Sequence, residues 1–399
     1  MSQKYPGGFI KAVVTPPTGG YYGSAPGVWT LEQAAYYQKN GLWPLTFTGG
    51  ALWEWGRNQY GQLGLGNITY YSSPKQVGAL TSWYSLTGGT DFVLAKKYDG
   101  TLWSWGYNVS GQLGLGNTTN YSSPKQVGAL TNWEFLAGGS DSILAKKYDG
   151  TIWAWGNNSR GQLGQSNITP LSSPKQVGAL TTWSVISSGG QYSFAIKTDG
   201  TLWSWGINSN GQLGLSNRTN YSSPKQVGAL TNWASISCGD SHNLAIKTDG
   251  TLWSWGYNVY GQLGLGNITS YSSPKQVGAL TTWSKIAAGS SFSLVIKNDG
   301  TLWSWGYNGT GTLGQGNATN YSSPKQVGAL TTWLSIAGCA AHVLAIQTNG
   351  TLWSWGLNSN GQLGLNNITN YSSPKQVGAL TTWYSVAGTK GPFSIAVSV

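Results

Sequence analysis

The sequence is poor in the groups that carry most protein chemistry. Its 399 residues include two Cys, two His and one Met, and only 8% of them are charged. Cys238 and Cys339 occupy unrelated positions and do not suggest a disulfide framework. His242 and His342 occupy equivalent positions two repeat units apart, which is too far for one metal site, and nearly half of the acidic residues belong to Asp-Gly turns. We therefore expect a protein that is not an enzyme, with no catalytic residues, no metal and no cofactor.

Long apolar runs are also missing. No run approaches the roughly 18 residues that a membrane span needs. The first residues, MSQKYPGGFIKAVV, lack the basic and apolar regions of a secretory leader. We expect no membrane insertion and no export through a leader.

Acidic residues are outnumbered, which gives a formal net charge of +11. Such a charge is compatible with an anionic partner such as nucleic acid. Much of it, however, comes from one Lys that recurs in each copy of the segment SSPKQVGAL, from Lys75 to Lys375. We expect these lysines to form an even ring that discourages strand aggregation rather than a nucleic-acid site.

What the chain has in abundance is a repeat rich in Gly and Trp. The stretch TLWSWGYNVSGQLGLGN at Thr101–Asn117 returns in seven versions at a constant spacing of 50 residues, starting at 51, 101, 151, 201, 251, 301 and 351. A fixed period of this length indicates a solenoid, a propeller or an array. Of the 23 Trp residues, most fall at fixed places in this repeat, and we expect them to form the core.

Each repeat contains four strand signals. In one copy we predict strands at 83–87, 92–98, 101–106 and 125–129, with a two-residue Asp99-Gly100 hairpin turn that has both central residues at positive φ. Seven such units predict an all-β, seven-bladed β-propeller over residues 45–399. An open solenoid is disfavoured because it needs atypical polar ends.

The two ends of the repeat region predict a shared seventh blade. It takes strands from 384–388 at one end and from 52–56 and 75–79 at the other. Its remaining strand is either Leu45–Gly50 or Phe393–Ser398, and we favour the second because it ties the chain ends together. The choice also decides on which side residues 1–44 join the propeller.

Residues 1–44 do not repeat. Pro and Gly residues make 1–28 an extended arm, and Thr30 with Gln33 and Asn40-Gly41 bracket a short helix at 31–39. A helix of this length needs a surface to pack on. We predict that it is a partner-docking arm that uses Trp29, Leu31, Tyr36, Tyr37 and Trp43.

Two resemblances extend this reading. WGYNVSGQLGLGN, the preceding LAIKTDG and the loops at 239–242 and 338–342 resemble the regulator of chromosome condensation repeat family over residues 46–399. The resemblance implies a seven-bladed propeller, and the best-known members are nucleotide exchange factors for a small GTPase. Because the founding member exchanges nucleotide through an insertion that this chain lacks, we do not expect exchange activity. GGFI and SAPGVWTLEQAAYYQKNGLWP resemble a module of tailed-bacteriophage virion proteins, which implies attachment to a virion.

The repeats differ mainly in two loops at the same end of each blade, whereas the Asp-Gly turns at the other end are nearly constant. The Gly-rich GQLGLG run between strands is not a phosphate loop, and we expect Gln62 to bond backbone between blades. Variable loops on a constant scaffold are typical of a binding face, although undirected drift of loop tips gives the same pattern. The candidate ligand-face residues are Arg57, Tyr60, Tyr107, Asn157, Arg160, Asn210, Tyr257, Tyr260, Tyr307 and Asn360.

Our leading hypothesis is a structural protein of a bacteriophage virion. The arm would hold the propeller on a capsid or tail protein, and the variable face would bind a host surface receptor, a glycan or another protein. The alternative is an intracellular adaptor or regulator that binds a GTPase or another protein partner. A third reading, a lectin or enzyme, is weaker because the Trp pairs belong to the core. The sequence is compatible with a homo-oligomer.

Overall fold

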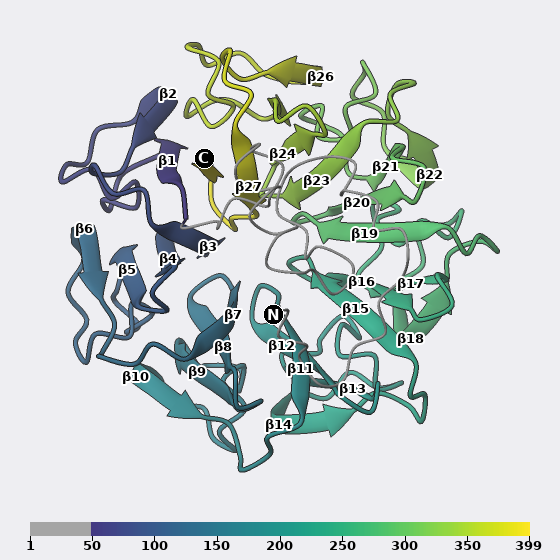
Figure 1. Ribbon diagram of the computed structural model, residues 1–399. Helices are drawn as coiled ribbons and strands as arrows, with labels where there is room; N and C mark the ends of the chain where they lie inside the picture. The colour runs from purple at the N-terminus through teal and green to yellow at the C-terminus, as the bar shows by residue number, and fades with distance from the viewer. Residues whose placement is uncertain (1–48) are drawn as a thin grey trace, which may run out of the picture. The chain divides into compact units, whose positions relative to one another are not determined.

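The computed structural model describes residues 49–399, and these residues form a ring of seven antiparallel sheets, as predicted (Figure 1). The predicted helix at 31–39 and the docking residues Trp29, Leu31, Tyr36, Tyr37 and Trp43 lie outside the described residues. Within residues 49–399 we find no helix long and apolar enough to span a membrane.

We name the blades A to G in chain order. Six blades are built from consecutive strands: β3 (Trp83–Gly88), β4 (Phe92–Lys97), β5 (Leu102–Gly106) and β6 (Tyr121–Gln126) in A; β7 (Trp133–Gly138), β8 (Ser142–Lys147), β9 (Ile152–Gly156) and β10 (Leu171–Gln176) in B; β11 (Trp183–Ser188), β12 (Tyr192–Lys197), β13 (Leu202–Gly206) and β14 (Tyr221–Gln226) in C; β15 (Trp233–Cys238), β16 (His242–Lys247), β17 (Leu252–Gly256) and β18 (Tyr271–Gln276) in D; β19 (Trp283–Ala288), β20 (Phe292–Lys297), β21 (Leu302–Gly306) and β22 (Tyr321–Gln326) in E; β23 (Trp333–Gly338), β24 (His342–Gln347), β25 (Leu352–Gly356) and β26 (Tyr371–Gln376) in F.

Blade G joins the two ends of the chain. It consists of β27 (Trp383–Ala387), β28 (Phe393–Ser398), β1 (Ala51–Gly56) and β2 (Tyr71–Gln76). Strand β28 lies between β27 and β1 and pairs with β1 along its whole length. The Phe393–Ser398 alternative is thus confirmed, while Gly50 forms only an isolated bridge to Trp83.

The fourth strand of each blade was placed too late in the sequence. In blade A it covers Tyr121–Gln126 rather than 125–129. Pro124 fits only because this strand is the outer edge of the blade and needs no full set of backbone donors. Its pairing with β5 has an irregularity between Ser104 and Gly106, and Gly128 at φ 59° turns the chain away after Gln126.

The Trp residues form the core, as predicted. Trp105 is completely buried, and its indole Nε1 donates to the carbonyl oxygen of Gln62 in the preceding blade at 3.1 Å. The same indole–carbonyl bond, at 2.9–3.1 Å, recurs at all seven blade junctions. Gln62 thus makes the predicted contact between blades through its backbone oxygen, and its side-chain Nε2 adds a second one by donating to Asp91 of blade A. Its Oε1 accepts from Tyr60 N in its own loop.

The two ends of the blades define two faces. The face with the Asp-Gly turns, which we call the hairpin face, carries the β4–β5 type of turn, and the loop face carries the β3–β4 and β5–β6 types. Asp99 Oδ1 accepts hydrogen bonds from Thr101 N and Oγ1, and these bonds hold the pKa of Asp99 low. Within this turn only Gly100, at φ 82°, has positive φ. The turn spans three residues, of which Gly100 is the last, rather than the two predicted.

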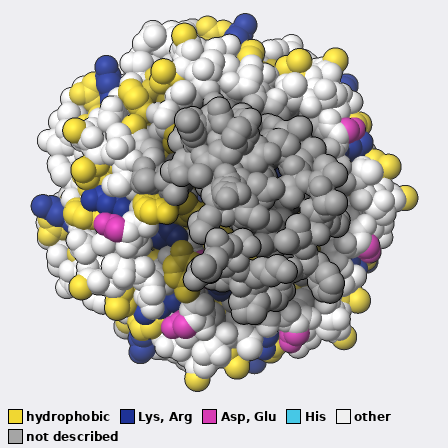
Figure 2. Space-filling model, viewed as in Figure 1, with side chains coloured by type: hydrophobic (Ala, Val, Ile, Leu, Met, Phe, Trp, Pro, Cys, Tyr) yellow, Lys and Arg dark blue, Asp and Glu magenta, His cyan; other side chains and the backbone are white. Residues whose placement is uncertain are grey.

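Charges on the hairpin face are spread round the rim. Figure 2 shows acidic side chains standing singly near lysines, with no large region of one sign in view. The repeated lysines, such as Lys75, lie on the outermost strands, where most of them cover the ring of a Tyr on the same strand, as Lys75 covers Tyr71. The predicted even ring of lysines is confirmed.

Candidate functional site

The loop face is built on a rigid β5–β6 type of loop. Asn108 is fully buried, and its Nδ2 donates to the carbonyl oxygens of Asn117 and Thr119 at 3.1 and 2.9 Å. Its Oδ1 accepts from Leu113 N at 2.9 Å. Equivalent Asn residues bond in the same way in the other blades. The residues on either side of this Asn can therefore vary without loss of the loop's shape.

All ten predicted ligand-face residues lie in these loops. The ring of Tyr60 in blade G packs on that of Tyr107 in blade A, with centroids 4.6 Å apart, and Tyr260 in blade D packs on Tyr307 in blade E at 5.0 Å. Arg57 is linked to the first pair through Gln59, which accepts from Arg57 and donates to the hydroxyl of Tyr60. The structure does not gather the rest into one cluster, because they are spread over blades B, C, D and F; they are Asn157, Arg160, Asn210, Tyr257 and Asn360.

The first aromatic pair is accompanied by an acidic group that the sequence reasoning missed. Asp91 accepts from Gln62 Nε2 at 2.8 Å and lies 3.8 Å from Arg57 Nη1. Burial raises the pKa of Asp91 to about 6 against the pull of Arg57, and Asp141 of the next blade adds to the rise. Both aspartates lie in the variable segments GGTDF and GGSDS, so a comparison of these loops between repeats could have identified them.

We had placed the two histidines in the loops at 239–242 and 338–342. In the structure they are instead the first residues of β16 and β24. Both are fully buried, and their Nε2 atoms lie 3.1 Å from Ser293 Oγ and 2.8 Å from Ser394 Oγ in the following blades. Burial lowers the pKa of His242 and of His342 to about 3. No group of three potential metal ligands occurs in residues 49–399.

Replacing both histidines by Phe should reduce the acid sensitivity of the fold. Phe92 and Phe292 occupy the same repeat position, so the substitutions suit the site. Because each histidine has a lower pKa when folded than when unfolded, the unfolded chain takes up more protons as pH falls below about 6.5. Urea unfolding should show that the double variant avoids a loss of about 2–3 kcal/mol per histidine between about pH 6.5 and 4.5. An equal loss in both proteins would contradict the assignment.

A lysine from blade G crosses the central channel. The channel, of about 250 Å³, is lined by the innermost strands of the blades. Lys390, in the β27–β28 loop, donates from Nζ to Cys238 O of blade D at 2.9 Å and lies 3.9 Å from Asp240. Cys238 and Cys339 are free and buried, and burial raises their thiol pKa to about 12 and about 11. Both cysteines thus serve as small buried residues.

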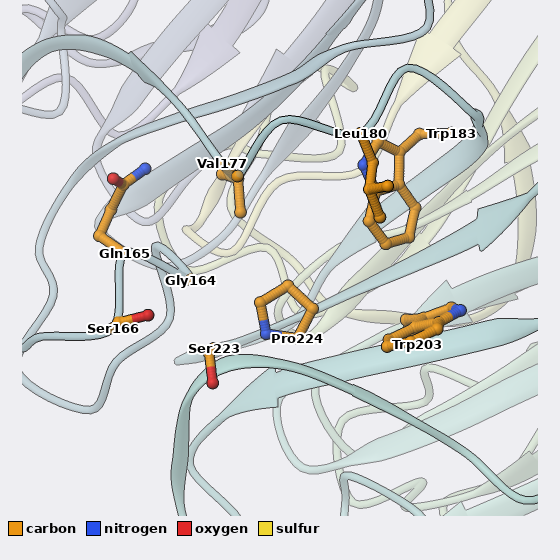
Figure 3. Close-up of a pocket in the computed structure, with 10 residues that line it drawn as sticks. Gly164, Gln165, Ser166, Val177, Leu180, Trp183, Trp203, Ser223 and Pro224 are labelled. Atoms are coloured by element: carbon orange, nitrogen blue, oxygen red, sulfur yellow. The ribbon is translucent and has the colours of Figure 1, made fainter.

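A second hollow of about 430 Å³ lies between blades B and C (Figure 3). The rings of Trp183 and Trp203 and the side chain of Leu180 line one side, and the amide of Gln165 and the hydroxyl of Ser166 line the other. No charged residue lines it, so it offers neither an acid nor a base for catalysis.

Models of known protein families match the repeat region of this chain. A model of the RCC1-like domain matches residues 136–337. Models of the regulator of chromosome condensation (RCC1) repeat match residues 49–95, 99–145 and 349–388, and a second such model matches 335–362. The first match alone spans half of the chain. The chain belongs to the RCC1-like domain family.

Several solved structures share this fold. Prp20p from Saccharomyces cerevisiae, studied for its binding to Gsp1p and histones, is 23% identical with a TM-score of 0.79, and the match covers 89% of this chain and 92% of Prp20p. Yeast RCC1 (Prp20) bound to Kap60 gives the same identity and score, with 89% and 90% coverage. Human WBSCR16 is 21% identical, with a TM-score of 0.78 and 88% and 100% coverage. A search of curated protein sequences gives no significant match.

Membership in the RCC1-like family overturns one prediction. We expected a protein that is not an enzyme, but the family to which the chain belongs includes the nucleotide exchange factors named by the resemblance. The prediction was wrong because it relied on the scarcity of acid pairs and metal ligands in the sequence. Nucleotide exchange makes no covalent bond and depends on how binding at one site weakens binding at another.

Proposed function

We propose that this RCC1-like propeller is an adaptor or regulator that binds a protein partner through its loop face. The observation that carries the proposal is the pairing of Tyr60 with Tyr107 and of Tyr260 with Tyr307 on loops that buried Asn residues hold in shape. Rigid, partly exposed tyrosines give large contact areas at little entropic cost. Arg57 and Asp91 beside the first pair supply charges that can fix the orientation of a partner.

A small GTPase of the Gsp1p type is the first partner that we propose. The similar yeast protein Prp20p was studied for its binding to Gsp1p and histones, and its match covers most of both chains. The β3–β4 and β5–β6 types of loop lie at the same end of all seven blades, so a globular partner can contact several blades at once. The affinity would then depend on the aromatic pairs as central contacts.

The test uses substitutions that the repeat itself supplies. Tyr60→Ser, Tyr260→Asn and Tyr307→Asn introduce residues found at the same repeat positions, namely Ser110, Asn210 and Asn157. With the full chain immobilised and a nucleotide-free Gsp1p-type GTPase in solution, we expect the triple variant to bind at least about tenfold more weakly. Release of a fluorescent GDP from the GTPase, measured in parallel, would report whether binding promotes exchange.

The matched control is Tyr98→Thr on the hairpin face, which introduces the residue of Thr198 and Thr248. It should leave the affinity for the GTPase unchanged. Equal binding by the triple variant and the unmodified chain would contradict the loop-face proposal. Failure of the unmodified chain to bind the GTPase, with core histones tested as the second probe, would remove this partner class.

Display on a bacteriophage virion is our second proposal, with the virion as the location of the protein. It rests on the resemblance of residues 1–44 to virion proteins and on the entry of the chain into blade G from the hairpin face, where Gly50 bridges Trp83. Attachment from that side would leave the loop face outward for a host receptor or glycan. Cryo-electron microscopy of purified particles should then show the propeller bound to a capsid or tail protein through residues 1–44. Particles without the protein would refute this proposal.

A further inference from the structure

Blades A and B differ from the others where the chain approaches the Asp-Gly turn. Their second strands run into Lys96-Lys97-Tyr98 and Lys146-Lys147-Tyr148. Four other blades have Ile in place of the first Lys and Thr or Asn in place of the Tyr, at 196, 246, 296 and 346 and at 198, 248, 298 and 348. The fold therefore needs neither the first Lys nor the Tyr, and their presence in two adjacent blades calls for another explanation.

These residues surround a pocket between blades A and B. It has a volume of about 340 Å³ and opens on the hairpin face, with a lining of Tyr84, Lys96, Tyr98, Asp99, Gly100, Thr131 and Tyr148. Tyr98 and Tyr148 are 55% and 65% exposed. In Figure 2 hydrophobic and basic side chains gather at the left of the view, over the region in which β3–β6 lie in Figure 1. The pocket thus presents aromatic rings to solvent on a face that the sequence comparison treated as uniform.

Lys96 supplies a buried cation at the wall of this pocket. Its side chain is almost inaccessible, and Nζ donates to the carbonyl oxygens of Trp133 and Glu134 at 3.1 and 3.0 Å. The ammonium also lies 5.0 and 5.6 Å from the ring centroids of Tyr84 and Tyr148. An ammonium group has three donors, and the two carbonyls take two of them.

The nearby carboxylates are already engaged. Glu134 pairs with Lys146, and the carboxylate of Asp99 accepts from Thr101. Burial lowers the pKa of Lys96, and the negative charge of Glu134 partly offsets this effect. Burial also lowers the pKa of Lys97, where Asp99 has the offsetting role. No carboxylate of residues 49–399 forms an ion pair with the Lys96 ammonium, which leaves its positive charge to be matched.

We propose that the pocket binds an acidic sugar, whose pyranose ring packs on Tyr98 and Tyr148 and whose carboxylate accepts a hydrogen bond from Lys96. Tyrosine rings combine an apolar face with a polar hydroxyl, which suits the mixed surface of a sugar. A charge-assisted hydrogen bond to a carboxylate is stronger than one between neutral groups. The net charge of +11 further favours an anionic ligand over a neutral one.

The first experiment compares two probes with the same sugar chain, one with free carboxylates and one with neutral methyl esters. Isothermal titration of the full chain with tetragalacturonate and with its methyl ester should show that the ester binds at least about tenfold more weakly. Saturation-transfer difference spectra should place the sugar ring protons against aromatic side chains. Equal affinities for the acid and the ester, or no binding of the acid, would overturn the proposal.

The second experiment uses variants already accepted by the fold. Lys96→Ile should reduce the affinity for tetragalacturonate by about tenfold or more, and Tyr98→Thr should weaken the ring contact. Tyr121→Leu is the control, because it removes a Tyr on an outer strand and introduces the residue that stands at Leu171. Unchanged affinity in Lys96→Ile would contradict the role of the ammonium. The loop-face triple variant should bind the sugar normally, so this proposal and the proposed function can fail separately.

Discussion

The variant Glu54→Ser is expected to be more stable than the unmodified chain. Glu54 is completely buried in β1, where Oε2 accepts from Trp105 Nε1 at 3.3 Å and Oε1 has no hydrogen-bond partner among the described residues. The same repeat position holds Ser in five other blades, and Ser104 Oγ donates to Leu113 O at 2.7 Å. Removing a buried, unsatisfied acid should raise the free energy of unfolding by about 1–3 kcal/mol.

The gain should depend on pH. Burial raises the pKa of Glu54 well above its ordinary value of 4.5, so the folded chain retains a proton that the unfolded chain gives up. As pH rises above about 4.5 the unfolded state loses this proton first, and the folded state becomes less stable relative to it. The difference between the variant and the unmodified chain should therefore grow from acidic pH toward pH 8.

Urea unfolding at several pH values would measure this effect. Glu54→Gln is the matched control, because it keeps the size of the side chain and removes the charge. Like Glu54→Ser, it should reduce the pH dependence of the free energy of unfolding. Unlike Glu54→Ser, it introduces no hydroxyl that could donate to a backbone carbonyl as Ser104 donates to Leu113 O. A Glu54→Ser variant that unfolds at lower urea concentration than the unmodified chain at pH 8 would contradict the analysis.

A chain that ends at Gly391 is expected to lose the closed ring. The deletion removes β28, which contributes the fully buried side chains Phe393, Ile395 and Val397. Burial of three such side chains contributes about 5–9 kcal/mol, which is comparable to the whole stability of many domains. The deletion also leaves β1 as an unpaired edge, which promotes aggregation.

Thermal unfolding followed by circular dichroism would test the role of β28. We expect the truncated chain to melt more than about 10 °C lower or to aggregate. Deletion of Val399 alone is the control, because this residue lies outside β28 and is 42% exposed. A synthetic peptide of residues 392–399 should partly restore the melting temperature. Equal melting of the truncated and complete chains would show that β28 does not close the ring.

The fold could be predicted because its signals are local and repeated. The spacing of Trp103 and Trp105 and the Asp99-Gly100 pair recur often enough to fix the number of blades. The fourth strand was misplaced because its pairing depends on tertiary position: Pro124 argues against a strand in isolation but is tolerated at the outer edge.

The candidate sites could be predicted only in part. The loop face follows from the alternation of strand directions, but the contact of Tyr60 with Tyr107 joins residues 47 positions apart on two blades. The pocket at Lys96 escaped notice for the same reason, since Tyr148 comes from the neighbouring blade. Comparing the repeats position by position shows which residues differ. It does not show which positions of adjacent blades are in contact in the folded protein.

The way in which blade G is assembled has a consequence for how such a chain can evolve. Both ends of the chain contribute to that one blade, and all the units between them are of equal length. A gene duplication or deletion of one internal unit of 150 nucleotides would preserve the reading frame and both halves of the closing blade. The number of blades can therefore change in a single recombination event, while the junction that seals the ring is inherited intact.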